Sequence, residues 1–134
     1  LKNRKKIRIP SITNYFLLYA DLNNELINKK IIKSLKNYNK SEKYIFSSIK
    51  PNHQSFEEKR YWRGPVWINC NWIIYQGLKN KDKLFSEVVK QKTIKIVEKK
   101  GFHEYYSCKS GKPMGANNFS WSAALYLDLV LTKC

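Results

Sequence analysis

Two short segments of the sequence combine aromatic rings with a few polar groups at close spacing. The first is YWRGPVW at 61–67, and the second is GFHEYY at 101–106, followed by GKPMG at 111–115 and FSWSAA at 119–124. Sugar recognition needs flat aromatic faces against the C–H bonds of the ring and a few fixed hydrogen-bonding groups for its hydroxyls. The aromatic faces would come from Tyr61, Trp62, Trp67 and Trp121, and the polar groups from Arg63, Asn69 and Asn71.

The charges of the chain avoid the segments that hold its tryptophans. From Tyr61 to Gly77 the only charged residue is Arg63, and from Met114 to Leu131 it is Asp128, yet these two segments contain all four Trp residues. A site for an uncharged, hydroxyl-rich ligand would have this composition. Two buried core helices would have it as well, and on composition alone they are the more common explanation.

Apolar residues at helical spacing predict two outer helices that each keep one solvated face. The first covers residues 22–36 and the second 82–99, with Asp82 at its start and Gly101 after its end. Their predicted core-facing residues are Leu22, Leu26, Ile27, Ile31 and Leu35 in the first helix, and Leu84, Phe85, Val88, Val89, Ile96 and Val97 in the second.

Two further helices are apolar nearly all round and are predicted to be inner helices. They cover residues 66–77, with Gly77 as the C-terminal cap, and residues 120–131, with Ser120 as the N-cap. The stretches 39–65 and 102–118 carry Ser, Asn, Gly and Pro without a period and are predicted to be irregular. A toroid of nested helical hairpins requires this alternation of outer and inner helices, so we predict an all-α fold formed by residues 1–134 as a single segment.

The formal charge of +16 raises the possibility of a nucleic-acid-binding module. Only four of the 26 basic residues are Arg, whereas nucleic-acid readers rely on Arg forks, and abundant Lys, Asn and Ile are what an AT-rich genome favours. We therefore expect no nucleic-acid partner. No apolar run approaches the roughly 18 residues of a membrane span, so we expect no membrane partner either.

Cysteine and histidine patterns suggest neither a metal site nor a disulfide framework. Cys70, Cys108 and Cys134 are an odd number without CxxC spacing, and His103-Glu104 lacks the second His of a zinc-protease motif because Ser107 stands there. We expect reduced thiols, no cofactor and no metal. A compartment cannot be assigned from these residues, although unpaired cysteines slightly favour the cytoplasm.

The order YWRGPVWIN, GFHEYY, then G-x-P-x-G-x-x-x-FSWSAA resembles the closing part of the catalytic domain of glycoside hydrolase family 63. That family includes processing α-glucosidases and hydrolases of mannosylglycerate and glucosylglycerate. The upstream IPSITNYFLLYADLNNE and SSIKPNHQSFEEKRYWRG are similar to the family as well, so the resemblance covers nearly the whole chain. It implies the C-terminal portion of an (α/α)6 barrel, with the remaining helices upstream.

The resemblance also implies residue roles in hydrolysis with inversion. Glu104 would be the general base, and its structural alternative is a loop carboxylate in a salt bridge. Tyr61, Trp62 and Trp67, with Gly64 between them, would line the sugar subsite, and Arg63 would orient the substrate. Trp121 could equally be a packed core residue. The family's acid is an Asp from helices that would precede Leu1, and Glu57 and Glu58 are the only candidates within this sequence.

Two alternatives remain open. The chain could be a non-catalytic carbohydrate-binding remnant of such an enzyme, or, less in keeping with its composition, a basic nucleic-acid-binding module. The sequence also departs from the common family pattern at Tyr106-Ser107-Cys108 and at Lys112-Pro113. These departures affect the expected conformation of the loop around Glu104 rather than the resemblance itself.

Overall fold

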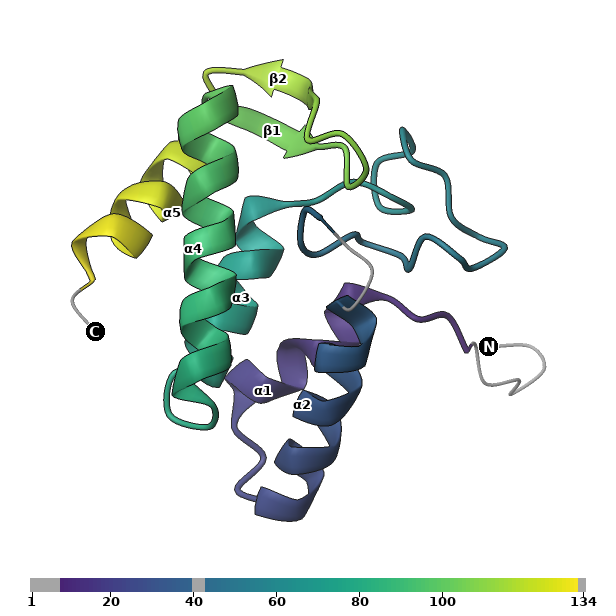
Figure 1. Cartoon of the computed structure of the whole chain (residues 1–134), viewed down its shortest axis with the longest axis vertical. Coiled ribbons are helices and arrows are strands. Elements are labelled where there is room, and N and C mark those ends of the chain that lie inside the picture. Colours follow the sequence, from purple (N-terminus) through teal and green to yellow (C-terminus); the bar gives the residue numbers. More distant parts are fainter. Residues whose placement is uncertain (1–7, 40–42, 133–134) are drawn as a thin grey trace.

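The computed structural model describes residues 8–39 and 43–132 of the chain (Figure 1). In chain order the elements are a 3-10 helix η1 (Ile12–Phe16), α1 (Leu17–Ala20), α2 (Glu25–Asn39), α3 (Ile68–Leu78), α4 (Lys83–Lys100), β1 (His103–Tyr106), β2 (Pro113–Asn117) and α5 (Ser120–Leu131). The fold is mostly helical, and all four predicted helices are present. None of the described helices is long and apolar enough to cross a bilayer.

The central helix is α3, which packs against α1, α4 and α5. Most of its residues are buried, as predicted for an inner helix. Gly77 was predicted to end this helix, but it lies inside it, and a Cβ placed there would come within 2.6 Å of the backbone nitrogen of Tyr19. The glycine therefore allows α1 to approach α3 closely, and the helix continues to Leu78.

The two outer helices bury only some of their predicted core-facing residues. The helix α2 begins at Glu25, and its buried residues are Asn28, Ile32, Leu35 and Tyr38, while Leu22, Leu26 and Ile27 are exposed. In α4 the buried residues include Phe85, Val89, Ile96 and Val97, but Leu84 and Val88 are exposed. Each helix carries two overlapping apolar stripes, and helical spacing cannot distinguish between them. Asp82 caps α4 by accepting from the Phe85 amide, as its position at the helix start indicated.

The last helix, α5, lies beside α3 as predicted, but it is covered on only one side. Its buried residues are Ser122 and Leu129, whereas Trp121, Leu127, Val130 and Leu131 are exposed. The residue at the N-cap position is Phe119, without a side-chain hydrogen bond, and Ser120 is already the first helical residue. Within the described residues, α5 therefore keeps an apolar face exposed to solvent.

The prediction of an all-α fold is wrong in one place. Residues 103–117, expected to be irregular, form an antiparallel strand pair in which Tyr106 pairs with Pro113 and His103 with Asn117. Figure 1 shows this pair across one end of α4. The glycines of the segment resemble loop punctuation in sequence, but Gly111 and Gly115 have φ of +68° and +73° and shape the hairpin. Residues 46–65 contain no helix, and isolated bridges link Ser47 to Val66 and Ser11 to Ile49.

One buried side chain ties this irregular segment to the helices. Asn71 on α3 is fully buried; its amide donates to the Ile45 carbonyl and to Thr93 Oγ1, and its carbonyl accepts from the Phe46 amide. The expectation that Asn71 offers a polar group to a sugar is therefore wrong. Its hydrogen-bonding groups are already used within the core.

Replacing Asn71 with Ala is expected to lower the free energy of unfolding by about 3 kcal/mol, because the buried Phe46 amide and Ile45 carbonyl lose this partner and the Thr93 hydroxyl loses a donor. Urea denaturation followed by circular dichroism measures the change. The matched control is Asn69→Ala on the same helix, where the side chain is only partly buried. Equal losses in the two variants would contradict the role given to Asn71.

Candidate active site

Two backbone hydrogen bonds bring the aromatic motif and the strand of Glu104 together. The Val66 amide donates to the Tyr106 carbonyl at 2.8 Å, and the Tyr106 amide donates to the Val66 carbonyl at 2.9 Å. Tyr106 is fully buried, and its hydroxyl donates to the Gly101 carbonyl at 2.6 Å, which fixes the entry to β1. Residues some forty positions apart in sequence thus occupy one surface.

Both carboxylate oxygens of Glu104 have a neutral hydrogen-bond donor. The Tyr61 hydroxyl donates to Oε1 at 2.5 Å, and the Ala116 amide donates to Oε2 at 3.1 Å. Glu104 itself is half-buried. A carboxylate anchored at both oxygens has a defined orientation, which is what a reacting group needs. The structural alternative for Glu104, a loop salt bridge, is not what its contacts show.

Three aromatic rings pack around Tyr61. Its ring meets Trp67 edge-on at 4.7 Å between centroids, Tyr105 at 5.4 Å and Trp62 at 6.0 Å, and Trp62 and Trp67 stack at 4.3 Å. Tyr61 and Trp62 remain 48% and 44% exposed, whereas Trp67 is 2% exposed. Tyr61 and Trp62 therefore present open aromatic surface beside Glu104, and Trp67 supports them from behind.

Trp67 also forms a hydrogen bond within the motif. Its indole N–H donates to the Tyr61 carbonyl at 3.0 Å. Tyr105, which the sequence patterns did not single out, lies at 4.8 Å from the other side of Trp67. The only signal for Tyr105 in the sequence was its position next to Glu104 in an aromatic run.

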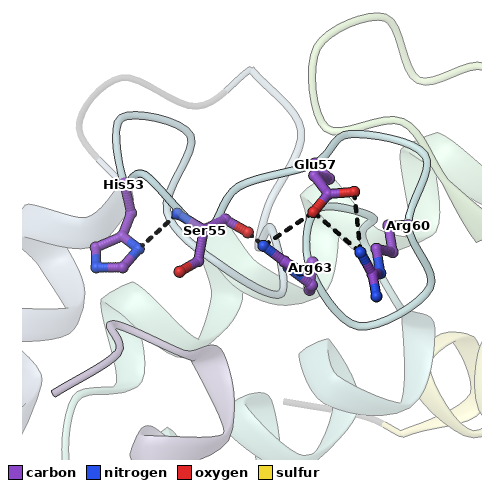
Figure 2. Close-up of polar contacts among 5 residues, drawn as sticks. All are labelled: His53, Ser55, Glu57, Arg60 and Arg63. Carbon is purple, nitrogen blue, oxygen red and sulfur yellow. Dashed lines mark hydrogen bonds and ion pairs between the residues drawn. The ribbon is translucent and has the colours of Figure 1, made fainter. Parts of the chain in front are cut away.

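Arg63 and Gly64 contact the loop that precedes the motif. The guanidinium of Arg63 donates to the Ser55 carbonyl at 2.9 Å and pairs with Glu57 at 2.9 Å, and Arg60 adds a second cation to Glu57 (Figure 2). A Cβ on Gly64 would lie 2.3 Å from the Glu57 carbonyl oxygen. Arg63 therefore points at its own loop, not at Glu104, and Gly64 permits a close backbone crossing.

Trp121 does not join the cluster around Tyr61. It is half exposed at the start of α5, and its ring neighbour among the described residues is Phe119, with centroids 6.4 Å apart. The start of α5 is nevertheless linked to β1, because Ser122 donates to the His103 carbonyl at 2.7 Å. The structure thus brings Tyr61, Trp62 and Trp67 to Glu104 and leaves Trp121 apart.

The other described carboxylates each have a polar partner of their own. Glu58 accepts from the Ser107 hydroxyl, and Asp128 accepts from the Trp72 indole at 2.6 Å and from Gln76 at 3.3 Å. Further partners are Lys81 for Asp21, Lys29 for Glu25, Arg63 for Glu57, Lys36 for Asp82, Gln91 for Glu87 and Tyr126 for Glu98. Glu42 lies outside the described residues.

The described residues offer no metal-binding group of three His, Cys, Asp or Glu side chains. Cys70 is buried in the core, and burial raises the pKa of its thiol to about 12, so it stays protonated at neutral pH. Such a thiol is neither a nucleophile nor a ready metal ligand. Cys134 lies outside the described part of the chain.

Residues 1–122 match the family described as the mannosylglycerate hydrolase MGH1-like glycoside hydrolase domain. A mannosylglycerate hydrolase of Thermus thermophilus is 42% identical over 88 residues, which are 63% of this chain and 21% of that protein. A glucosylglycerate hydrolase of Mycolicibacterium hassiacum is 30% identical over 89 residues, 63% of this chain and 19% of that protein. The chain thus spans about a fifth of the length of these relatives.

Solved structures agree with these similarities. The crystal structure of a GH63 mannosylglycerate hydrolase from Thermus thermophilus, in complex with Tris and D-glycerate, matches with a TM-score of 0.84 and 31% identity. The match covers 90% of this chain and 30% of that chain. The same hydrolase in complex with glucose matches with a TM-score of 0.84 and 29% identity, over 95% of this chain and 32% of that chain.

The contact between Tyr61 and Glu104 makes a prediction about pH. Its hydrogen bond to the carboxylate, with a smaller effect of desolvation, raises the pKa of the Tyr61 phenol. The stabilisation from this pair is therefore fully present below the unfolded-state pKa of about 10 and is lost as the pH rises through the raised pKa. NMR titration of ¹³Cζ-labelled tyrosine should place Tyr61 above the ordinary value, and Glu104→Gln should move it back. Glu98→Gln, on α4, should leave it unchanged.

Proposed function

Because the chain belongs to the mannosylglycerate hydrolase MGH1-like glycoside hydrolase family, we propose that it supplies the general base and part of the sugar subsite of an inverting glycoside hydrolase. The base is Glu104. The observation that carries this proposal is the anchoring of both Glu104 oxygens beside the half-exposed rings of Tyr61 and Trp62. Stacking surface and carboxylate must converge on one sugar for hydrolysis to occur.

In this proposal Glu104 activates water. The carboxylate takes a proton from a water molecule as the water oxygen attacks the anomeric carbon, while an acid on the opposite face protonates the departing glycosidic oxygen. Tyr61 remains protonated because of its raised pKa, so it stays a donor and does not compete for that proton. The free lone pairs of the anchored oxygens are then the ones available to water.

The acid is proposed to come from a segment outside these 134 residues. Inversion needs two carboxyl groups roughly 6.5–9.5 Å apart, and the described carboxylates other than Glu104 are engaged with partners of their own. Glu57 is one of these, since it is paired with both Arg60 and Arg63. The exposed apolar residues of α5 suit packing against further helices, in keeping with a portion of an (α/α)6 barrel.

The substrate class follows from the relatives. The relatives described above are hydrolases of mannosylglycerate and glucosylglycerate, so we propose an α-mannoside or α-glucoside as substrate, with glycerate as the favoured aglycone. The Tyr61 and Trp62 rings suit the cleaved hexose. The glycerate carboxylate would need a cationic partner from outside this surface, since Arg63 is committed to Glu57.

A carbohydrate-binding remnant is the second candidate. It is favoured by one observation: the aromatic surface is open to solvent while the carboxylates near it in sequence, Glu57 and Glu58, are tied to other side chains. Such a protein would bind sugar without cleaving it. The two candidates share the aromatic site and differ in whether Glu104 serves chemistry.

The 134-residue chain alone is expected to hydrolyse no glycoside, because loss of general acid catalysis by itself costs roughly 10²–10⁴-fold and an open site stays wet. Release of sugar from aryl glycosides and from mannosylglycerate is the measurement. Turnover that disappears with Glu104→Gln would show that an acid is present within the chain, and Glu57 or Glu58 would be the residues to substitute next.

A chimaera tests Glu104 in a complete enzyme. The portion of the Thermus thermophilus mannosylglycerate hydrolase that aligns with this chain is replaced by residues 1–134. We expect the folded chimaera to cleave mannosylglycerate, and Glu104→Gln to lower kcat by about 10²-fold or more with an unchanged melting temperature. Glu98→Gln is the matched control and should keep activity. A chimaera that binds mannose but gives the same rate with Gln at 104 would favour the remnant.

A further inference from the structure

The strand pair carries an irregularity opposite Glu104. His103 pairs with Asn117 and Tyr105 pairs with Met114, so one residue of β1, Glu104, faces two residues of β2. These two are Gly115 and Ala116. Two residues opposite one define a β-bulge, and a bulge with Gly at its first position uses a left-handed backbone there. Gly115 has φ of +73°, in keeping with that type.

The bulge sets the direction of one amide. An extra residue in a strand leaves the regular ladder of hydrogen bonds, so its polar groups can turn to another partner. Here the Ala116 amide donates to Glu104 Oε2 at 3.1 Å. A regular strand pair in this register would direct its amides to backbone carbonyls of the neighbouring strand.

Gly115 is also in close contact with the carboxylate. A Cβ at this position would lie 2.5 Å from Glu104 Oε2, 2.8 Å from Glu104 Cβ and 2.6 Å from Tyr105 Cε1. Heavy atoms do not approach so closely, so any larger residue must displace Glu104, Tyr105 or the strand. The space beside the carboxylate exists only because residue 115 has no side chain.

We propose that Gly115 is a positioning residue for Glu104: its missing side chain lets the bulge of β2 lie against the carboxylate, so that the Ala116 amide and the Tyr61 hydroxyl hold both oxygens in one orientation. The geometric part stands on these contacts alone. The consequence for catalysis rests on the proposed function of Glu104. A Cβ at position 115 pushes Oε2 away from Ala116 and thereby Oε1 away from Tyr61.

Glycine at position 115 could be required by its positive φ alone or by its close contact with Glu104. A comparison with Gly101 distinguishes these two explanations. Gly101 has φ of +80°, but a Cβ there would meet only the His103 ring at 3.9 Å, an ordinary contact. With ψ of −176°, Gly101 has a backbone conformation that is essentially restricted to glycine, so Gly101→Ala also carries a backbone cost. Only Gly115→Ala places a methyl group against Glu104.

The test uses the full 134-residue chain and the NMR titration of Tyr61, with Tyr61→Phe to assign its resonance. Gly115→Ala is expected to lower the raised Tyr61 pKa toward the ordinary value, as Glu104→Gln does, and Gly101→Ala to leave it where it is. The Ala116 amide resonance should also shift in Gly115→Ala. An unchanged Tyr61 titration in folded Gly115→Ala, or equal changes in the two glycine variants, would overturn the proposal.

A second variant covers the case in which Gly115→Ala does not fold. In a Glu104→Ala background the methyl group at 115 no longer meets a carboxylate, so the added cost of Gly115→Ala in melting temperature should shrink, the sign of coupling between contacting residues. The same cost in both backgrounds would contradict the proposal.

Measurements of turnover distinguish the positioning role of Gly115 from the proposed role of Glu104 as the general base. In the chimaera, Gly115→Ala should lower kcat about tenfold or more with a small change in KM, since positioning affects the reacting group more than sugar binding. If Glu104→Gln abolishes turnover and Gly115→Ala does not lower it, the base assignment stands and the positioning role fails. If neither variant affects turnover while Gly115→Ala still moves the Tyr61 titration, the geometric proposal stands and the base assignment fails.

Discussion

The pairing of Val66 with Tyr106 is the constraint on which the rest of the site depends. Two reciprocal backbone hydrogen bonds, both shorter than 3.0 Å, join the end of the aromatic motif to the end of β1. Glu104 lies two residues before one partner and Tyr61 five residues before the other, so their contact follows from this bridge. Ser47 pairs with the same Val66, and three separate stretches of chain therefore meet at one buried residue.

The aromatic motif contains one buried ring, Trp67, and two half-exposed rings, Tyr61 and Trp62. Trp67 is buried between Trp62 and Tyr105 and closes the turn through its bond to the Tyr61 carbonyl. Only because Trp67 fills that position can Tyr61 and Trp62 stand half exposed in fixed orientations. A motif that in sequence resembles a row of equivalent sugar-stacking rings is thus a layered structure, in which the most buried ring need not touch a ligand.

The sequence predicted the helices well but their buried faces only in part. Long periodic or uncharged runs identify a helix, but α2 and α4 each carry two apolar stripes, and only tertiary packing selects Ile32 over Leu26 and Val89 over Val88. The hairpin was missed because Gly111 and Gly115 indicate a loop in sequence, whereas in space they permit a turn and a bulge. Tyr61, Trp62 and Glu104 were predicted as site residues because they lie in recognisable motifs. Their mutual contacts were not predicted, because they depend on a β-bulge and an isolated β-bridge, and neither has a periodic signature in sequence.

The groups that bind Glu104 are neutral, although the protein is strongly basic. The protein carries a net charge of +16, yet the groups that bind Glu104 are a phenol and a backbone amide, and both are neutral. The nearest cation in the motif, Arg63, is instead bound to Glu57 and Ser55, where it holds the preceding loop. Two neutral donors, one on each oxygen, fix the direction of the carboxylate, and lone pairs on both oxygens stay free to accept further hydrogen bonds. Because Arg63 pairs with Glu57, the loop gains its ion pair, and the groups that bind Glu104 are a phenol and a backbone amide.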